Sequence, residues 1–182
     1  MALMKFITEN AVNSPYDQKY KDDNAIVDVI GYVCNPEKTD GYIGGWAVDP
    51  CHAAYEMELV AKLFHNNHGV RLRHWVITFT ADELCKLEHC FLCGPIDSLY
   101  LLGAYFSMYY KDQYQILYAV HNGAQPHLHF VMNVVSYVDG KKFSGRKTDY
   151  YQYEKYAKSI AHQVGITLYI VKDRTASKYY HT

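Results

Sequence analysis

The segment YQILYAVHNGAQPHLHFVMNVV, Tyr114–Val135, constrains the fold more than any other part of this chain. From His127 onward polar and apolar residues alternate, so His127 and His129 share one face of a strand. A second strand-like run, residues 115–121, comes before it, and the connection, residues 122–126, is short and rich in turn formers. The sequence therefore predicts an antiparallel hairpin.

The hairpin predicts a metal site. Pairing of the two strands brings His121 beside His127 and His129. Neutral imidazoles bind Mn, Co, Ni and Zn ions, and three of them leave positions open for substrate oxygens. A single histidine, or one HxH pair, is more often an ordinary surface or core residue. The third histidine across the turn is what favours metal binding.

Composition indicates one domain of ordinary size. The chain has 182 residues, of which 49% are hydrophobic, and we expect a domain over 1–171 with a tail over 172–182. No apolar run approaches the roughly 18 residues of a membrane span, and the first seven residues are too short for a signal peptide. We therefore expect a cytoplasmic protein without membrane insertion. The net charge of −1 means that any nucleic-acid binding must come from local patches.

The five cysteines are odd in number and scattered, which favours reduced thiols over a disulfide framework. Cys90 and Cys93 form a CxxC near His89. Without a second such pair, thiols spaced along a helix explain them better than zinc.

The remaining periodicities alternate between strand and helix. The segment 35–46 is rich in glycine and turn formers, and we expect a loop there. A capping box at Thr80–Glu83 starts one helix. The other expected strands are 2–8, 71–79 and 166–171, and the other helices are 25–33 (capped by Asp22 or Asp23), 49–66, 95–110 and one from Thr148 or Asp149 to Gly165.

A basic run follows the hairpin. Lys141, Lys142, Arg146 and Lys147 place four cations in seven residues around the flexible Gly145. Such a run is usually a solvated loop, but it is also suited to phosphate contacts.

Four segments in order, VIGYVCNPEKTDG, GVRLRHWVITFTADE, AVHNGAQPHLHFVMNVV and GKKFSGRKTDYYQYEKYAKSIAHQVGI, resemble the nuclease domain of plasmid mobilisation relaxases. These enzymes are members of the HUH endonuclease superfamily, and the resemblance spans about 26–170. It implies an α+β, two-layer fold with a central antiparallel sheet of about five strands flanked by helices. It also implies Mg- or Mn-dependent nicking and strand transfer on single-stranded DNA at a plasmid or mobile-element transfer origin, with accessory relaxosome proteins as further partners.

The resemblance assigns roles to individual residues. Tyr32 matches the nucleophile, which forms a 5′-phosphotyrosine intermediate, and His121, His127 and His129 match the metal-binding motif. Thr78 stands where the family has a small hydroxyl residue near the DNA backbone. The residues expected to contact DNA are Thr78, Asn133, Lys38, Arg73, Lys141, Lys142, Arg146 and Lys147.

Two other functions are compatible with the sequence. A rolling-circle replication initiator or single-strand transposase would use a tyrosine after the histidine motif, and Tyr150, Tyr151, Tyr153 and Tyr156 lie there. The order of motifs favours Tyr32. A nuclease-inactive DNA-binding module is the other alternative, because Gly123 stands where these relaxases commonly carry an acidic residue.

Overall fold

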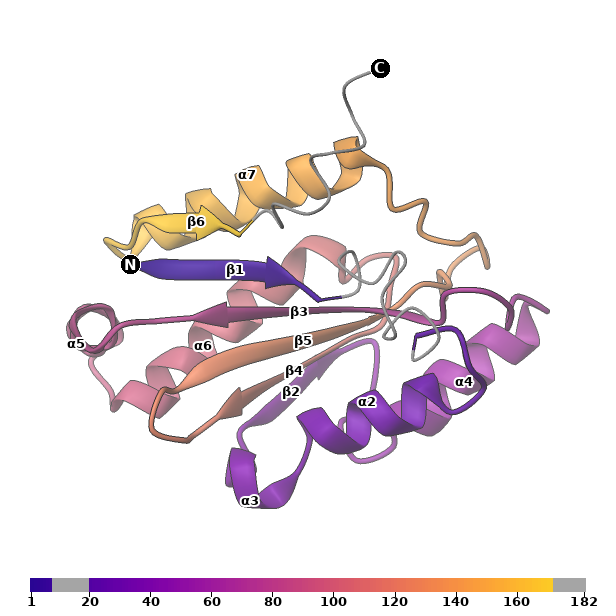
Figure 1. Cartoon of the computed structure of the whole chain (residues 1–182), viewed down its shortest axis with the longest axis horizontal. Helices are drawn as coiled ribbons and strands as arrows, with labels where there is room; N and C mark the ends of the chain where they lie inside the picture. Colours follow the sequence, from indigo (N-terminus) through magenta and orange to yellow (C-terminus); the bar gives the residue numbers. More distant parts are fainter. Residues whose placement is uncertain (8–19, 172–182) are drawn as a thin grey trace.

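A six-stranded sheet forms the centre of the computed structural model, which describes residues 1–7 and 20–171 (Figure 1). The expected tail, 172–182, and Thr8 of the first expected strand lie outside these residues. The strands run in the order β2-β4-β5-β3-β1-β6, and every pair is antiparallel except β1 with β6. Their bounds are β1 Ala2–Phe6, β2 Ile43–Trp46, β3 Leu72–Thr78, β4 Ile116–His121, β5 His127–Asn133 and β6 Leu168–Ile170.

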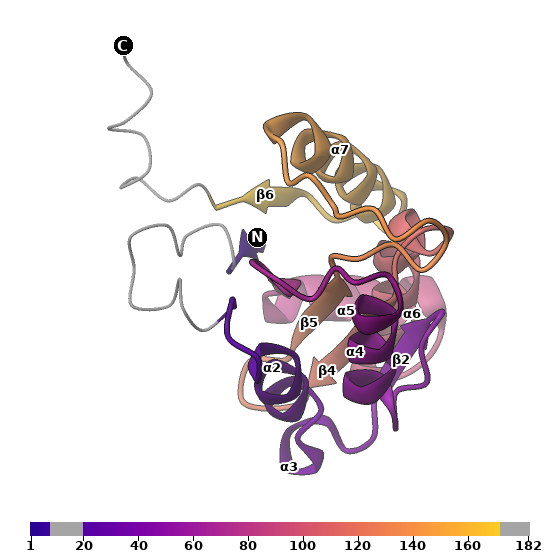
Figure 2. The same cartoon turned by 90° about the vertical axis from the view of Figure 1, so that its right-hand side faces the viewer.

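Helices cover both faces of this sheet (Figures 1 and 2). On one face α2 and α4 pack against apolar residues such as Leu117 and Val131. On the other, α6 and α7 pack against residues such as Trp75 and Phe130. This confirms the predicted α+β class, a mainly antiparallel sheet flanked by helices. The helices are α2 Ala25–Val33, α3 Pro36–Thr39, α4 Ala53–Leu63, α5 Ala81–Phe91, α6 Pro95–Ser107, the 3-10 turn η2 Met108–Tyr110 and α7 Lys147–Gln163.

Over residues 1–7 and 20–171, no single helix has both the length and the apolar character to cross a membrane; α5 and the stretch Pro95–Tyr110 pass that test only together, across an 80° bend.

The predicted hairpin is confirmed with a defined register. His121 lies opposite His127, and Ala119 lies opposite His129. On its other side β5 pairs with β3, which sets Thr78 opposite His127. Since side chains alternate along a strand, all three histidines lie on the face that α2 covers.

The segment expected to be a loop instead forms α3 and β2. Asn35 caps α3 by accepting a hydrogen bond from the Glu37 N–H at 2.9 Å. β2 pairs with β4, so the sheet has six strands rather than about five. A Cβ atom at Gly44 would overlap the Tyr118 ring. The absence of a side chain at Gly44 lets the two strands and the Tyr118 ring pack closely. This glycine-rich segment is therefore a strand and not a loop.

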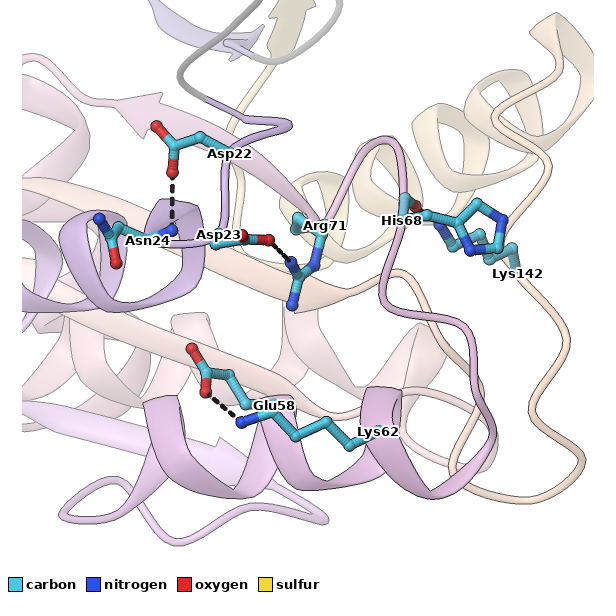
Figure 3. A network of polar contacts seen from close by, with 8 residues as sticks. All are labelled: Asp22, Asp23, Asn24, Glu58, Lys62, His68, Arg71 and Lys142. Carbon is cyan, nitrogen blue, oxygen red and sulfur yellow. Dashed lines mark hydrogen bonds and ion pairs between the residues drawn. The ribbon is translucent and has the colours of Figure 1, made fainter.

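Two polar contacts lie at the start of α2, one local and one to the residue before β3 (Figure 3). Asn24, not Asp22 or Asp23, is the N-cap residue, and the Asp22 carboxylate accepts from the Asn24 N–H at 2.7 Å. Asp23 forms an ion pair with the buried Arg71 at 3.3 Å. Because Arg71 directly precedes β3, this contact joins the start of α2 to that strand, while the apolar residues of α2 pack against the sheet.

The first turn of α4 begins later than predicted. The helix starts at Ala53 rather than at Asp49. The Asp49 carboxylate accepts hydrogen bonds from the Cys51 N–H and the His52 ring, and Glu56 accepts from the Asp49 N–H. These contacts hold the turn that precedes the helix.

Candidate active site

Three histidines gather where β4 and β5 meet the turn between them. We call His121, His127 and His129 the histidine triad. Their ring centroids are 4.1 Å (121–129), 4.9 Å (127–129) and 5.1 Å (121–127) apart, and one ring nitrogen from each lies within 4.8 Å of the others. His121 and His129 are buried, while His127 is half-buried. The triad therefore sits on the rigid sheet and opens at one side.

Hydrogen bonds orient the triad rings. His121 donates from Nε2 to the Val33 carbonyl at 3.0 Å, and His127 donates from Nδ1 to the Gln125 carbonyl at 2.8 Å, because a carbonyl oxygen only accepts. In the neutral rings this leaves lone pairs on Nδ1 of His121 and Nε2 of His127. The Nε2 atoms of His127 and His129 are 3.1 Å apart.

The environment keeps the buried rings uncharged. Burial lowers the pKa of His129 to about 2, and the neighbouring His74, His121, His127 and Lys38 reinforce the shift. Burial is also the largest cause of the lowered pKa of His121. Neutral imidazole is the form that binds metals.

The triad fits a divalent cation. Two nitrogens bound to one ion at about 2.1 Å and at right angles are about 3.0 Å apart, close to the separation of the His127 and His129 Nε2 atoms. The donors are three neutral nitrogens from adjacent strands, which is the donor set expected for an open transition-metal site. Within the described residues, no triad ring hydrogen-bonds a carboxylate.

Tyr32 lies over the triad. It comes from the last turn of α2, and its ring meets His121 and His129 edge-on, with both centroid distances 5.6 Å. The Val33 carbonyl that accepts from His121 belongs to the next residue, so the same helix end contacts the triad twice. Tyr32 remains 47% exposed. Its hydroxyl-bearing ring is therefore both close to the triad and open to solvent.

Lys38 and Thr78 lie at the edge of the site formed by Tyr32 and the triad. The Lys38 Nζ lies 4.1 Å from the centroid of the Tyr32 ring. The hairpin turn holds α3 there, since the Asn122 N–H donates to the Lys38 carbonyl at 2.6 Å. Thr78 is exposed at the end of β3, opposite His127. The structure thus brings Tyr32, Lys38, Thr78 and the triad together.

Other residues predicted to contact DNA lie elsewhere. Asn133 is fully buried; its amide donates to the Met57 carbonyl and to Gln115, and its oxygen accepts from the Val135 N–H. These bonds tie β5 to α4.

Arg73 faces the opposite side of the sheet from the triad. Its guanidinium carbon lies 5.9 Å from the ring centroids of both Phe143 and Tyr150.

The basic run lies at the far end of β5 from the triad. Asn133 lies six steps along β5 from His127, which corresponds to about 20 Å at 3.3 Å per residue. Lys141 forms an exposed ion pair with Asp139 at 2.8 Å, and Lys142 donates to the His68 carbonyl. Figure 3 shows Lys142 beside the loop that follows α4.

One residue of the site was missed by sequence reasoning. Nε2 of His74 lies 2.9 Å from Nδ1 of His129. Alternation along β3 places His74 on the same face as Thr78, but the sequence does not show that β3 lies beside β5. The strand order supplies that information.

The comparison with protein families agrees with this geometry. The model of the relaxase family described as MobA/VirD2-like, nuclease domain, matches residues 32–166, well over half of the chain. The matched region begins at Tyr32 and contains the histidine triad. No curated protein matches the chain. The chain therefore belongs to the MobA/VirD2-like relaxases and contains their DNA-nicking nuclease domain.

Proposed function

We propose that this chain nicks one DNA strand at a plasmid or mobile-element transfer origin and retains the cut end as a 5′-phosphotyrosine on Tyr32. One observation carries the proposal: the Tyr32 ring contacts two triad histidines while remaining half exposed. A nucleophile and a set of metal ligands thus share one solvent-accessible place. The cytoplasmic location and the accessory relaxosome proteins stay predictions.

The proposed reaction conserves the number of phosphoester bonds. The Tyr32 oxygen attacks the scissile phosphorus and loses its proton, forming the bond from tyrosine to the 5′-phosphate. The bond from phosphorus to the 3′-oxygen breaks, and that oxygen leaves and takes up a proton. Because an ester replaces an ester, attack by a 3′-hydroxyl can reverse the step and rejoin a strand. No external energy source is required.

Each residue near Tyr32 has a role in this proposal. The triad would hold a Mg or Mn ion, which, when bound, neutralises phosphate charge and favours attack by a weak nucleophile. Lys38 adds a cation for the phosphate beside the tyrosine. The Thr78 hydroxyl would donate to the DNA backbone, and its position opposite His127 at the exposed end of β3 supports this role. The scissile strand must be unpaired, or extruded as a hairpin, to reach this sheet surface.

The tyrosines after the histidine motif fit the reaction less well. Tyr153 is completely buried and its hydroxyl accepts a hydrogen bond from the Trp75 indole at 3.0 Å. Tyr156 donates to the Tyr105 carbonyl at 2.7 Å. Both lie on α7, which covers the sheet face opposite the triad (Figure 2). This placement supports Tyr32 over a nucleophile on α7.

Covalent capture tests the proposal. Single-stranded origin oligonucleotides labelled on the 3′ side of the nick are incubated with the protein and Mn²⁺, and the adduct is resolved under denaturing conditions. We expect the Tyr32→Phe variant to lose the adduct and retain DNA binding, since the hydroxyl acts in the transition state. The control Tyr151→Phe changes a 54% exposed tyrosine on α7 and should form the adduct normally. Adduct formation by Tyr32→Phe would overturn the assignment.

Metal titration separates an enzyme from a nuclease-inactive module. Calorimetry should show one Mn²⁺ bound by the wild type and none by the double variant His127→Ala, His129→Ala. The exposed histidine of α7 provides a control, His162→Gln, which should bind as the wild type does. A wild type that binds DNA but no metal would support the inactive module instead.

A further inference from the structure

A fourth histidine lies beside the triad and is hydrogen-bonded to one of its members. His74 comes from β3 and is 6% exposed. Its Nε2 is 2.9 Å from Nδ1 of His129, and the two rings stack with centroids 5.2 Å apart. His121 and His127 each donate to a backbone carbonyl, whereas the corresponding hydrogen bond of His129 goes to His74. The orientation of His129 therefore depends on a side chain.

The hydrogen bonds in this structure run in one direction, from His74 through His129 to His127. His127 donates from Nδ1 to a carbonyl, so its neutral ring has an unprotonated Nε2. That nitrogen can only accept from Nε2–H of His129, 3.1 Å away. His129 then has an unprotonated Nδ1, which accepts from Nε2–H of His74. In this state His74 is the donor.

If the triad held a cation, the direction of these hydrogen bonds would be reversed. His129 can offer Nε2 to an ion only if its proton is on Nδ1, where it must be donated to His74. Nε2 of His74 must then be the acceptor, with the single proton of a neutral ring on Nδ1. The number of protons is unchanged, because one moves between the nitrogens of each ring. A side chain that can either donate or accept is therefore needed at position 74.

We propose that His74 is a positioning residue that accepts the Nδ1–H of His129 and so holds the Nε2 of His129 toward the catalytic ion. This inference rests on the metal site of the proposed function. It also explains how the site can have Gly123 in place of an acidic residue. His129 is the triad residue whose ring is oriented by a side chain, and that side chain, His74, comes from β3 and not from the hairpin turn.

Two variants of His74 separate positioning from packing. His74→Leu fills similar space but cannot accept a hydrogen bond. Its Kd for Mn²⁺ should rise about 10- to 100-fold, the usual effect of losing such a partner. His74→Gln keeps an acceptor and a donor, and should restore affinity to within a few-fold of the wild type. Calorimetry measures the affinities, and thermal unfolding in chelator reports the stability of each fold.

The outcomes are distinct. Weak binding by His74→Leu with recovery in His74→Gln supports the role. Equal affinity of His74→Leu and wild type overturns it, as does an equal loss in both variants, which indicates packing alone. If the wild type itself binds no Mn²⁺, the metal site of the proposed function fails first, and His74 has no ion to position.

Nuclear magnetic resonance tests the wild type directly, even if a variant fails to fold. Correlations between ring protons and ¹⁵N in the Zn²⁺-loaded protein identify which nitrogen of His129 carries its proton. We expect the proton on Nδ1 in the loaded protein and on Nε2 in chelator. A proton on Nε2 in both states, or on Nδ1 in both, overturns the proposed exchange of roles.

Discussion

In the proposed reaction, Lys38 would act on the phosphate that Tyr32 attacks. Its Nζ lies 4.1 Å from the centroid of the tyrosine ring, and a hydrogen bond from the hairpin turn fixes its helix. We expect Lys38→Met to weaken binding of single-stranded DNA and to lower the slope of log affinity against log salt by about 0.7, the value for one phosphate contact. Fluorescence anisotropy at several salt concentrations measures both.

A matched control for this variant is Lys62→Met. Lys62 is an exposed lysine of α4 whose ammonium group pairs with Glu58 at 3.1 Å (Figure 3). Its replacement should leave the salt slope unchanged. Equal slopes for wild type and Lys38→Met would remove Lys38 from the DNA contact.

The buried His129 also makes the stability of the protein depend on pH when the metal is removed by a chelator. The pKa of His129 falls from its usual 6.5 to about 2 on folding, so below pH 6.5 the unfolded chain binds a proton that the folded chain does not. The stabilisation that depends on a neutral His129 is therefore fully present above pH 6.5. Below pH 6.5 the free energy of unfolding decreases by about 1.4 kcal/mol for each pH unit. The groups that face His129 are His74, His121, His127 and Lys38.

Urea unfolding in chelator at pH 7.5 and 5.5 measures this dependence. The wild type should lose stability on acidification, and His129→Gln should lose less because one titrating group is absent. His162→Gln, which changes an exposed histidine, should follow the wild type. The same loss in wild type and His129→Gln would contradict the assignment to His129.

The sequence predicts some residues of the site and not others for a physical reason. Alternation and a short turn are local features, and they predict that His121, His127 and His129 converge. The position of His74 depends on β3 pairing with β5, a contact between distant parts of the chain. Asn133 shares the histidine face, but its burial against α4 depends on how a helix crosses the sheet.

At the scale of secondary-structure elements, β2 shows how glycine can mislead a prediction. Isolated glycines usually weaken strands, so 35–46 reads as a loop. In the structure Gly44 gives the Tyr118 ring space across the β2–β4 pair. The strand therefore depends on the fit between Gly44 and its neighbour on β4, which lies far away in the sequence.

Two glycine substitutions test this reading. Gly44→Ala should destabilise the protein by about 1–3 kcal/mol, because the new methyl overlaps the Tyr118 ring. Gly31→Ala in α2 meets no heavy atom within 4 Å and should stabilise the helix by about 0.5–1 kcal/mol. Urea unfolding gives both values. A neutral Gly44→Ala would mean that β2 has room for a side chain.

At the scale of the whole molecule, the two regions expected to contact DNA lie at opposite ends of β5. The triad and Tyr32 lie at its start, and the basic run lies beyond its end. The separation of about 20 Å along the strand equals roughly six base pairs of duplex at 3.4 Å each. A phosphate bound by the basic run would therefore belong to DNA that flanks the nick, not to the scissile linkage.

This separation yields a prediction about substrate length. Neutralising Lys141, Lys142, Arg146 and Lys147 together should lower the salt slope by up to about 0.9 for each duplex phosphate contact that is lost. The effect should appear with an origin hairpin that carries flanking duplex, and disappear with a short single strand that covers only the nick. The Lys141 pair with Asp139 is exposed and so is weak enough for DNA to displace it. Cleavage of the short strand should be unaffected, because Tyr32 and the triad lie elsewhere. An unchanged slope on the long substrate would make the run a solvated loop, and an equal drop on both substrates would place it beside the scissile phosphate.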